Sequence, residues 1–311
     1  MIRDNEIKAQ VSPFAIREGE IKVFDGKDGY VSMNQIVHKI DIGHITDIHF
    51  KILDLVNQFE FITSRQLYQI LELRKVDLVS QDKLNNKLEQ LVKCKILTRY
   101  YFTSDEGKGI FRVYCMDKMG KYLLESKETE TKWKQSDNTK PVEMIKKRLA
   151  GNQTIIAYLV KVKAFDGYMV KPVINAKMLG KTFKASGGSI KLSKNNRTIE
   201  FVFEVIRREE EWVERAIDRM RLYKDFYENY VPGDSQFKTM PQLVIVCEDE
   251  LHMKEIFKII VTNKLEFENA NIYYTTDLRQ NSDTLESTLV QFKLIDGKYK
   301  MEDVELKLLG E

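Results

Sequence analysis

Six polar side chains between residues 81 and 90 have the chemistry that reads base pairs: Gln81, Lys83, Asn85, Asn86, Lys87 and Gln90. Amide groups can make paired hydrogen bonds to adenine, and lysine reaches guanine or phosphate. Leu84, Leu88 and Leu91 lie among them at the spacing of a helix with one buried side. The sequence therefore predicts a helix that exposes an amide and ammonium face, with Ser80 as its N-cap.

Two more helices and a β-hairpin are expected around this helix. Residues 48–59 carry apolar side chains at helical spacing, and Thr63 with Gln66 forms a capping box that opens a second helix. Strands over residues 96–102 and 110–116 follow the third helix. This order predicts a winged helix-turn-helix domain over residues 47–125, whose third helix enters the major groove of DNA.

The loop of this hairpin, over residues 103–109, adds little to a DNA surface. It carries Asp105 and Glu106, offset by Lys108 alone, and is a poor clamp for phosphate. Winged helices also serve as interaction or dimerisation modules, and a polar helix face is often only solvated. The DNA-binding residues that we predict are Ser80, Gln81, Lys83, Asn85, Asn86, Lys87 and Lys108.

The composition is that of an ordinary globular protein. The chain has 311 residues, enough for two domains, with 43% hydrophobic residues and a net charge of +3. DNA binding would thus depend on a local basic face. No apolar run is long enough to span a bilayer, and no secretory signal opens the sequence, so the cytoplasm is expected. Cys94, Cys115 and Cys247 are expected to be reduced core thiols.

Around the predicted DNA-binding domain, the sequence indicates an extension, a linker and a second domain. Residues 1–46 are interpreted as a β-rich extension, with a hairpin of 16–24 and 30–37 around a turn at 25–29. Residues 126–141 are polar and are interpreted as a linker, or as an exposed continuation of the preceding helix. Residues 142–311 form the second domain.

Strands and helices alternate in that domain, which predicts a mixed sheet flanked by helices. Helices are expected at 144–160, where Gly151 is a candidate break, and at 209–230 and 250–261. The expected strands are 189–192, 199–206, 242–247 and 271–275, with 289–294 and 299–309 as candidate edge strands.

An apolar stripe on the 209–230 helix has two possible uses. Its residues are Trp212, Ala216, Met220, Tyr223 and Tyr227. The stripe can pack wholly on its own sheet. Alternatively, its C-terminal end, residues 223–230, contacts a second copy, because tyrosine and tryptophan are favoured at interfaces. The second use predicts a homodimer.

Two segments resemble the plasmid replication-relaxation family of Gram-positive bacteria. Residues 114–124 are similar to the strand, polar turn, glycine and helix that follow the wing in this family. Residues 201–205 are similar to the family's glutamate-bearing strand, and the helix that comes after them ends with residues 220–227. The similarity covers roughly residues 48–277. It implies a DNA-binding protein of a plasmid or related mobile element, acting in replication or DNA processing. It also implies a second half that looks like a restriction endonuclease, giving an α+β or α/β fold class.

Nuclease chemistry needs an acidic residue on one strand and Glu-x-Lys or Asp-x-Lys on the next, to hold Mg²⁺ and activate water. Here Glu204 is followed by Val205 and Ile206, and residues 188–192 carry no carboxylate. We therefore expect a non-catalytic domain without a cofactor, in which Glu204 is structural. Arg207 and Arg208 would pair with Glu204 or contact phosphate.

Other candidate sites are weaker. His38, His44 and His49 have no zinc-site spacing, and residues 186–189 lack the Gly-Lys-Ser/Thr ending of a phosphate-binding loop, so a flexible turn is expected. The basic run at 146–148 either tracks a DNA backbone or is simply solvated.

Together these features predict a sequence-specific protein that binds double-stranded DNA. Its expected role is that of an origin-binding replication initiator or accessory factor of a plasmid or mobile element, working as a homodimer with a host replication protein. Two alternatives remain: a transcriptional regulator with a C-terminal sensing or dimerisation domain, and a Mg²⁺-dependent nuclease with a rearranged site.

Overall fold

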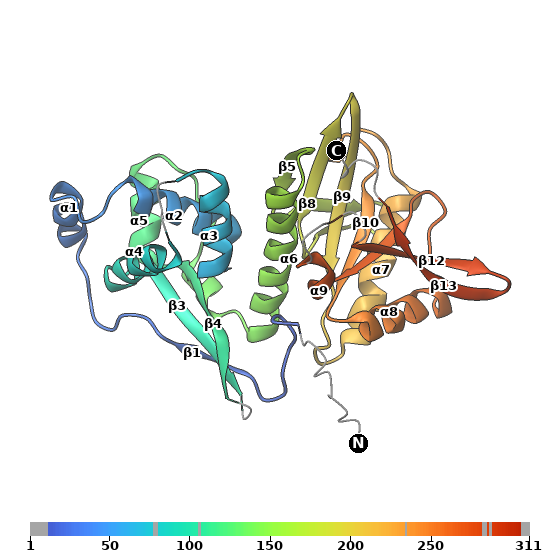
Figure 1. The fold of residues 1–311 in the computed structure, drawn as a ribbon, viewed down its shortest axis with the longest axis horizontal. Helices are drawn as coiled ribbons and strands as arrows, with labels where there is room; N and C mark the ends of the chain where they lie inside the picture. The colour runs from blue at the N-terminus through green and yellow to red at the C-terminus, as the bar shows by residue number, and fades with distance from the viewer. Residues whose placement is uncertain are drawn as a thin grey trace, which may run out of the picture. The chain divides into compact units, whose positions relative to one another are not determined.

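The structure is a computed structural model that describes residues 12–76, 80–104, 107–233, 235–281, 285 and 288–305 (Figure 1). The chain is a mixed α+β protein that divides into two compact units. We call Ile16–Val160 the N-unit, and Met1–Ala15 with Lys161–Glu311 the C-unit. The boundary lies after residue 160, not at the start of the helix that we expected to open the second domain.

The N-unit contains six described helices and one four-stranded antiparallel sheet, ordered β1-β3-β4-β2. The strands are β1 (Ile21–Phe24), β2 (Ile62–Thr63), β3 (Leu97–Ser104) and β4 (Gly107–Met116). The helices are α1 (Met33–Asp41), α2 (Asp47–Phe59), α3 (Ser64–Leu73), α4 (Gln81–Lys93), α5 (Lys118–Ser126) and α6 (Val142–Lys161), with a 3₁₀ turn, η1 (Gln135–Thr139), before α6.

The local signals for α2, α3 and α4 are confirmed. The Thr63 hydroxyl accepts a hydrogen bond from the backbone N–H of Gln66 at 3.2 Å. In return, the Gln66 side-chain oxygen accepts from the backbone N–H of Thr63 at 3.1 Å. Ser80 accepts from the Lys83 backbone at 3.3 Å and starts α4. These caps satisfy backbone N–H groups that have no partner inside a helix. Cys94, Cys115 and Cys247 are buried free thiols, as expected.

The N-terminal hairpin prediction is wrong. Only one of its two segments is a strand, and β1 pairs with β3. Over the other segment the chain begins α1, because Ser32 and Gln35 form a capping box: the Ser32 hydroxyl accepts from the Gln35 backbone, and the Gln35 side chain accepts from the Ser32 backbone at 2.9 Å. Ile36 is the buried residue of this helix. Local capping thus overrides the β-branched composition.

The β3–β4 hairpin is longer than predicted. Thr103 pairs with Lys108 and Ser104 with Gly107, so the strands occupy most of the expected loop over residues 103–109. Asp105 and Glu106, and the side chain of Lys108, lie outside the described residues.

The segment expected to be a linker is bound to the N-unit. Thr131 donates to the Asn57 side chain at 2.7 Å, and Asn138 donates to the Met116 carbonyl at 2.9 Å. Lys22 reaches back to the carbonyls of Asn138 and Lys140, both at 2.7 Å. The polar side chains of residues 126–141 form hydrogen bonds with neighbouring elements of the N-unit. The interpretation of this segment as a linker is therefore wrong.

Helix α6 is continuous through Gly151, which does not break it. The Asn152 amide donates to the carbonyls of Phe59 and Phe61, at 3.1 and 2.7 Å. Gln66 donates to the Leu149 carbonyl at 2.8 Å. These buried hydrogen bonds join α6 to the ends of α2 and α3, which explains why it belongs with the N-unit.

The C-unit is built on a seven-stranded mixed sheet, ordered β13-β12-β11-β10-β9-β8-β5. The strands are β5 (Phe165–Met169), β8 (Ser189–Lys194), β9 (Arg197–Val205), β10 (Gln242–Cys247), β11 (Ile272–Thr276), β12 (Leu289–Ile295) and β13 (Lys298–Val304). Strands β9, β10 and β11 are parallel to one another. The predicted mixed sheet is confirmed. Both candidate edge segments form strands, but only β13 lies at the edge, and residues 306–309 of the second candidate lie outside the described residues.

Three helices and a separate hairpin complete the described C-unit: α7 (Trp212–Glu228), α8 (Glu250–Thr262), α9 (Asp277–Gln280), and the strands β6 (Val173–Ala176) and β7 (Lys181–Lys184). The β8–β9 turn forms as expected, since Asn195 and Asn196 both have positive φ, 50° and 61°, as a tight two-residue turn requires. Strands β5, β6 and β7 were not predicted.

The predicted partner contact on α7 is wrong. Met220, Tyr223 and Tyr227 are 0% exposed. Tyr223 packs edge-on against Phe183 at 5.0 Å, and Tyr227 stacks on Phe267 at 4.3 Å between ring centroids. The stripe fills the core of its own unit, which is the first of its two expected uses, so Tyr223 and Tyr227 are not available to a second copy.

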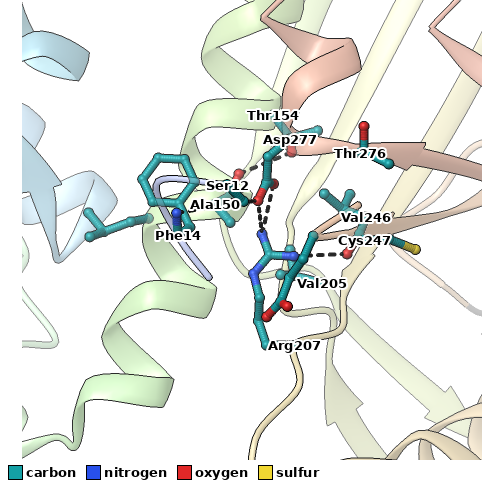
Figure 2. A network of polar contacts seen from close by, with 12 residues as sticks. Ser12, Phe14, Ala150, Thr154, Val205, Arg207, Val246, Cys247, Thr276 and Asp277 are labelled. Atoms are coloured by element: carbon teal, nitrogen blue, oxygen red, sulfur yellow. Dashed lines mark hydrogen bonds and ion pairs between the residues drawn. The ribbon is translucent and has the colours of Figure 1, made fainter. Parts of the chain in front are cut away.

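A buried ion pair joins the ends of the parallel strands (Figure 2). Arg207 follows β9, and one of its nitrogens donates to both carboxylate oxygens of Asp277, just after β11, at 2.8 and 2.9 Å. Its other terminal nitrogen reaches the Val246 carbonyl of β10 at 3.3 Å. Ser12 also donates to Asp277, which ties an N-terminal segment of the chain to this point.

We expect Asp277→Ala to lower the free energy of unfolding by roughly 3–5 kcal/mol, because it leaves a buried guanidinium without its counter-charge. The matched control is Asp218→Ala, which removes the partner of Arg221 from an exposed pair and should cost about 0–1 kcal/mol. Urea unfolding followed by circular dichroism measures both. Equal losses in the two variants would show that the buried pair is not a main support of the C-unit.

A second prediction concerns pH. His252 is buried, its Nδ1 accepts from the Glu248 backbone at 3.3 Å, and its ring lies edge-on to Trp212. Burial, with the nearby charges of Arg208 and Arg207, lowers the pKa of His252 from 6.5 to about 3. Between these values the unfolded chain binds a proton that the folded chain does not, so stability falls as the pH drops below about 6.5.

This histidine should contribute a slope of up to about 1.4 kcal/mol per pH unit, and His252→Phe should remove that contribution. Unfolding free energies of both proteins, measured from pH 4.5 to 7, give the difference in slope. Parallel curves for the wild type and the variant would contradict a neutral buried imidazole.

Candidate nucleic-acid interface

Packing of α4 determines which side chains it presents. Leu84, Leu88 and Leu91 are buried, and the helix contacts α3, β3 and α2. With this apolar side fixed, residues on the opposite side face outward. Asn85 and Asn86 are both exposed there, as predicted.

Two of the predicted residues bond to each other. The Gln81 side-chain nitrogen donates to the Ser64 carbonyl at 3.3 Å and to the Asn85 side-chain oxygen at 3.2 Å. Gln81 therefore links α4 to the start of α3, and Asn85 has its acceptor engaged. Ser80 is occupied as the N-cap. These three residues hold the helix in place.

Gln90 has a different partner in the buried ring of His49. Nδ1 of His49 accepts from the Thr46 backbone at 3.0 Å, so Nε2 carries the proton and donates to the Gln90 side-chain oxygen at 2.7 Å. Burial lowers the pKa of His49; the Gln90 hydrogen bond opposes this shift and the Lys87 charge adds to it. A neutral imidazole thus connects α2 to the outer side of α4.

Three of the predicted DNA-binding residues form a continuous polar surface with Gln90, and we call this surface the α4 stripe: Lys83, Asn86, Lys87 and Gln90. They line a shallow depression of about 410 Å³ together with Ile48 and Lys51 of α2 and Val76. None of the described residues that line it carries a carboxylate. Of the two acidic residues on α4, Glu89 accepts from Arg99 at 2.6 Å, and Asp82 is exposed in the first turn.

The stripe is a concentration of unneutralised positive charge. Within the described ranges, Lys51, Lys83 and Lys87 make no ion pair, in contrast to Lys93, which pairs with Glu89. Cations that lack a counter-ion in the protein are suited to phosphate oxygens, and an amide among them can reach a base edge. The arrangement can bind a polyanion.

Glu204, the carboxylate on β9 that a nuclease site would need, has hydrogen-bond partners for both of its oxygens. Glu204 is buried and accepts from Arg219 at 2.8 and 3.1 Å, from the Tyr223 hydroxyl at 2.8 Å and from the Ser186 backbone at 3.2 Å. The Arg219–Tyr223 spacing of four on the following helix is the signal that could have revealed this partner. A carboxylate held this way has no free oxygen for a metal.

The neighbouring basic residues also have internal partners. Arg207 pairs with Asp277, and Arg208 pairs with Asp249 at 2.7 Å and Glu255 at 3.0 Å, so the expected pairing of either arginine with Glu204 is wrong. Residues 186–189 are not a flexible turn, because Gly187 and Gly188 hydrogen-bond to Phe203 of β9, at 2.9 and 2.8 Å.

The basic run at 146–148 is structural. Lys146 is buried against Glu20, and Arg148 lies 3.5 Å from Glu60. Among the residues that the structure describes, no group of three His, Cys, Asp or Glu side chains is placed to hold a metal ion.

Comparison with protein families, with curated proteins and with solved structures gives no match for this chain. The resemblance to the replication-relaxation family thus depends on the two segments quoted for it. None of the helices in the described ranges is both long enough and apolar enough to cross a membrane.

Proposed function

We propose that this chain is a sequence-specific double-stranded DNA-binding protein whose N-unit is a winged helix-turn-helix. The element order supports this: α2, β2, α3 and α4 are followed by the β3–β4 hairpin, and β2 pairs with the free side of β4. A third helix presented by three-helix packing beside a small sheet is the arrangement that such domains use to enter a major groove.

The observation that carries the proposal is the α4 stripe. Lys83 and Lys87 provide ammonium groups for phosphate or guanine, and Asn86 provides an exposed amide between them. The amide can make a paired hydrogen bond to adenine. Because Asn85 is bonded to Gln81, Asn86 is the better placed of the two asparagines to read a base.

We further propose a role in replication of a plasmid or mobile element, as an origin-binding initiator or accessory factor. The resemblance of residues 114–124 and 201–205 supports that context. A non-catalytic C-unit agrees with the occupied oxygens of Glu204. A homodimer on a repeated site would double the contacts of a single reading helix.

Asn86→Ala should lower the discrimination between the cognate duplex and a scrambled one. Loss of one bidentate base contact costs about 1–3 kcal/mol. The matched control is Asn85→Ala, the same substitution at an exposed position of the same helix, which should keep most of the discrimination. The cognate site is first found by footprinting DNA that flanks the gene, and fluorescence anisotropy then measures both affinities.

Wild-type discrimination in Asn86→Ala, or equal loss in both variants, would remove the α4 stripe as the reader. Failure of the wild-type protein to protect or bind any duplex would reject the proposed function.

A further inference from the structure

Positive charge is concentrated in one stretch of the C-unit. Residues 167–199 contain seven lysine and arginine residues and no aspartate or glutamate. The whole chain has a net charge of only +3, so the remainder is net negative. This stretch includes β6, β7 and β8. Such segregation produces a local field that the overall charge hides.

The β6–β7 hairpin presents part of this charge on one face. Val173 pairs with Lys184 and Asn175 with Thr182, and all four side chains are exposed. Their neighbours along the strands, Ile174, Ala176 and Phe183, are buried in the core of the C-unit. Because side chains alternate across a strand, the exposed residues share one side, which we call the hairpin outer face.

The connecting turn carries two exposed apolar side chains between lysines. Met178 is 76% exposed and Leu179 is 49% exposed, and Lys177 and Lys181 flank them with Gly180 at a φ of 60°. The turn is anchored, since the Met178 backbone donates to the Asp225 carboxylate at 3.1 Å. Large apolar groups held in water by an anchored turn point to a binding surface.

Two lysines lie on β7: Lys184 on the hairpin outer face, and Lys181, whose partner across the hairpin is the buried Ala176, at the exposed end beside the turn. Lys181 and Lys184 make no ion pair with any residue that the structure describes, although Lys191 nearby in the sequence pairs with Asp166. Asn175 and Thr182 hydrogen-bond to each other at 3.2 Å and leave a polar strip on the outer face. Ammonium, amide and hydroxyl groups are the side chains that contact phosphate and sugar.

We propose that the β6–β7 hairpin is a second DNA contact, distinct from the α4 stripe. Lys181 and Lys184 would neutralise phosphates, while Met178 and Leu179 enter the minor groove, where proteins often insert apolar wedges flanked by cations. The occupant is double-stranded DNA rather than a lipid surface, because two apolar side chains beside a polar strip bury too little area for stable membrane binding. The contact is independent of sequence.

The first test is the salt dependence of binding by the full-length protein to a labelled non-specific duplex. Each phosphate contact contributes about 0.9 to the slope of log K against log salt concentration. Lys181→Gln with Lys184→Gln should reduce the slope by about 1.8. The matched control, Lys254→Gln with Lys258→Gln, changes the charge equally on the exposed side of α8 and should leave the slope unchanged. An unchanged slope in the hairpin variant, or equal changes in both, would overturn the proposal.

The second test addresses the apolar turn. Met178→Ser with Leu179→Ser should weaken binding several-fold at fixed salt without altering the slope, because no charge is removed. Leu251→Ser with Leu294→Ser is the matched control, since these leucines are 64% and 63% exposed elsewhere in the C-unit. Wild-type affinity in the turn variant, or equal weakening in the control, would contradict insertion.

A third pair of substitutions separates this proposal from the proposed function. Lys83→Gln with Lys87→Gln tests the α4 stripe in the same salt series. If only the α4 variant has a reduced salt slope, the hairpin contact is wrong and DNA binding by the α4 stripe is supported. If only the hairpin variant has a reduced salt slope, the hairpin contact is supported and the α4 stripe is not a DNA contact. Hairpin-dependent binding to vesicles with anionic lipid, with no change on duplex DNA, would make the surface a membrane contact and overturn the proposal. So would absence of duplex binding at low salt.

Discussion

The proposed interface depends on the rotation of α4 about its own axis. Burial of Leu84, Leu88 and Leu91 sets that rotation, because turning the helix would expose these side chains to water. The hydrogen bond from His49 to Gln90 sets it again from the side of α2. Because both contacts fix the rotation of α4, the α4 stripe faces outward. Gln81, which bonds to Ser64 of α3, is not part of this stripe.

In the described part of the C-unit, several buried or partly buried charges form ion pairs with one another. Arg207 pairs with Asp277, Arg219 with Glu204 and Arg208 with Asp249. A carboxylate that binds a catalytic metal must keep oxygens free, whereas these serve to hold strands and helices together. The unneutralised charge of this unit is instead exposed, as on the hairpin outer face. In both units, therefore, the features suited to binding are surface cations.

Local signals in the sequence were enough to predict α2, α3 and α4, because capping residues and apolar spacing act within a few neighbours. The capping box at Ser32 is the same kind of signal and it does form a helix, but the prediction followed the β-branched composition of residues 30–37 and placed a strand there. Pairings that span the fold could not be predicted: Arg219 reaches Glu204 only after β9 and α7 pack. The alternative use of the α7 stripe, a contact with a second copy, stayed open because the β6–β7 hairpin, which brings Phe183 onto Tyr223, was not predicted.

The claim that the α4 stripe binds DNA is tested most directly by lysine labelling with mass spectrometry, in the presence and absence of the footprinted duplex. Lys51, Lys83 and Lys87 surround the depression beside α4, so bound DNA should slow their modification. Lys254 and Lys258 on α8 should react at the same rate in both states and serve as internal controls. Unchanged reactivity of Lys51, Lys83 and Lys87 at saturating DNA would contradict DNA binding by the α4 stripe.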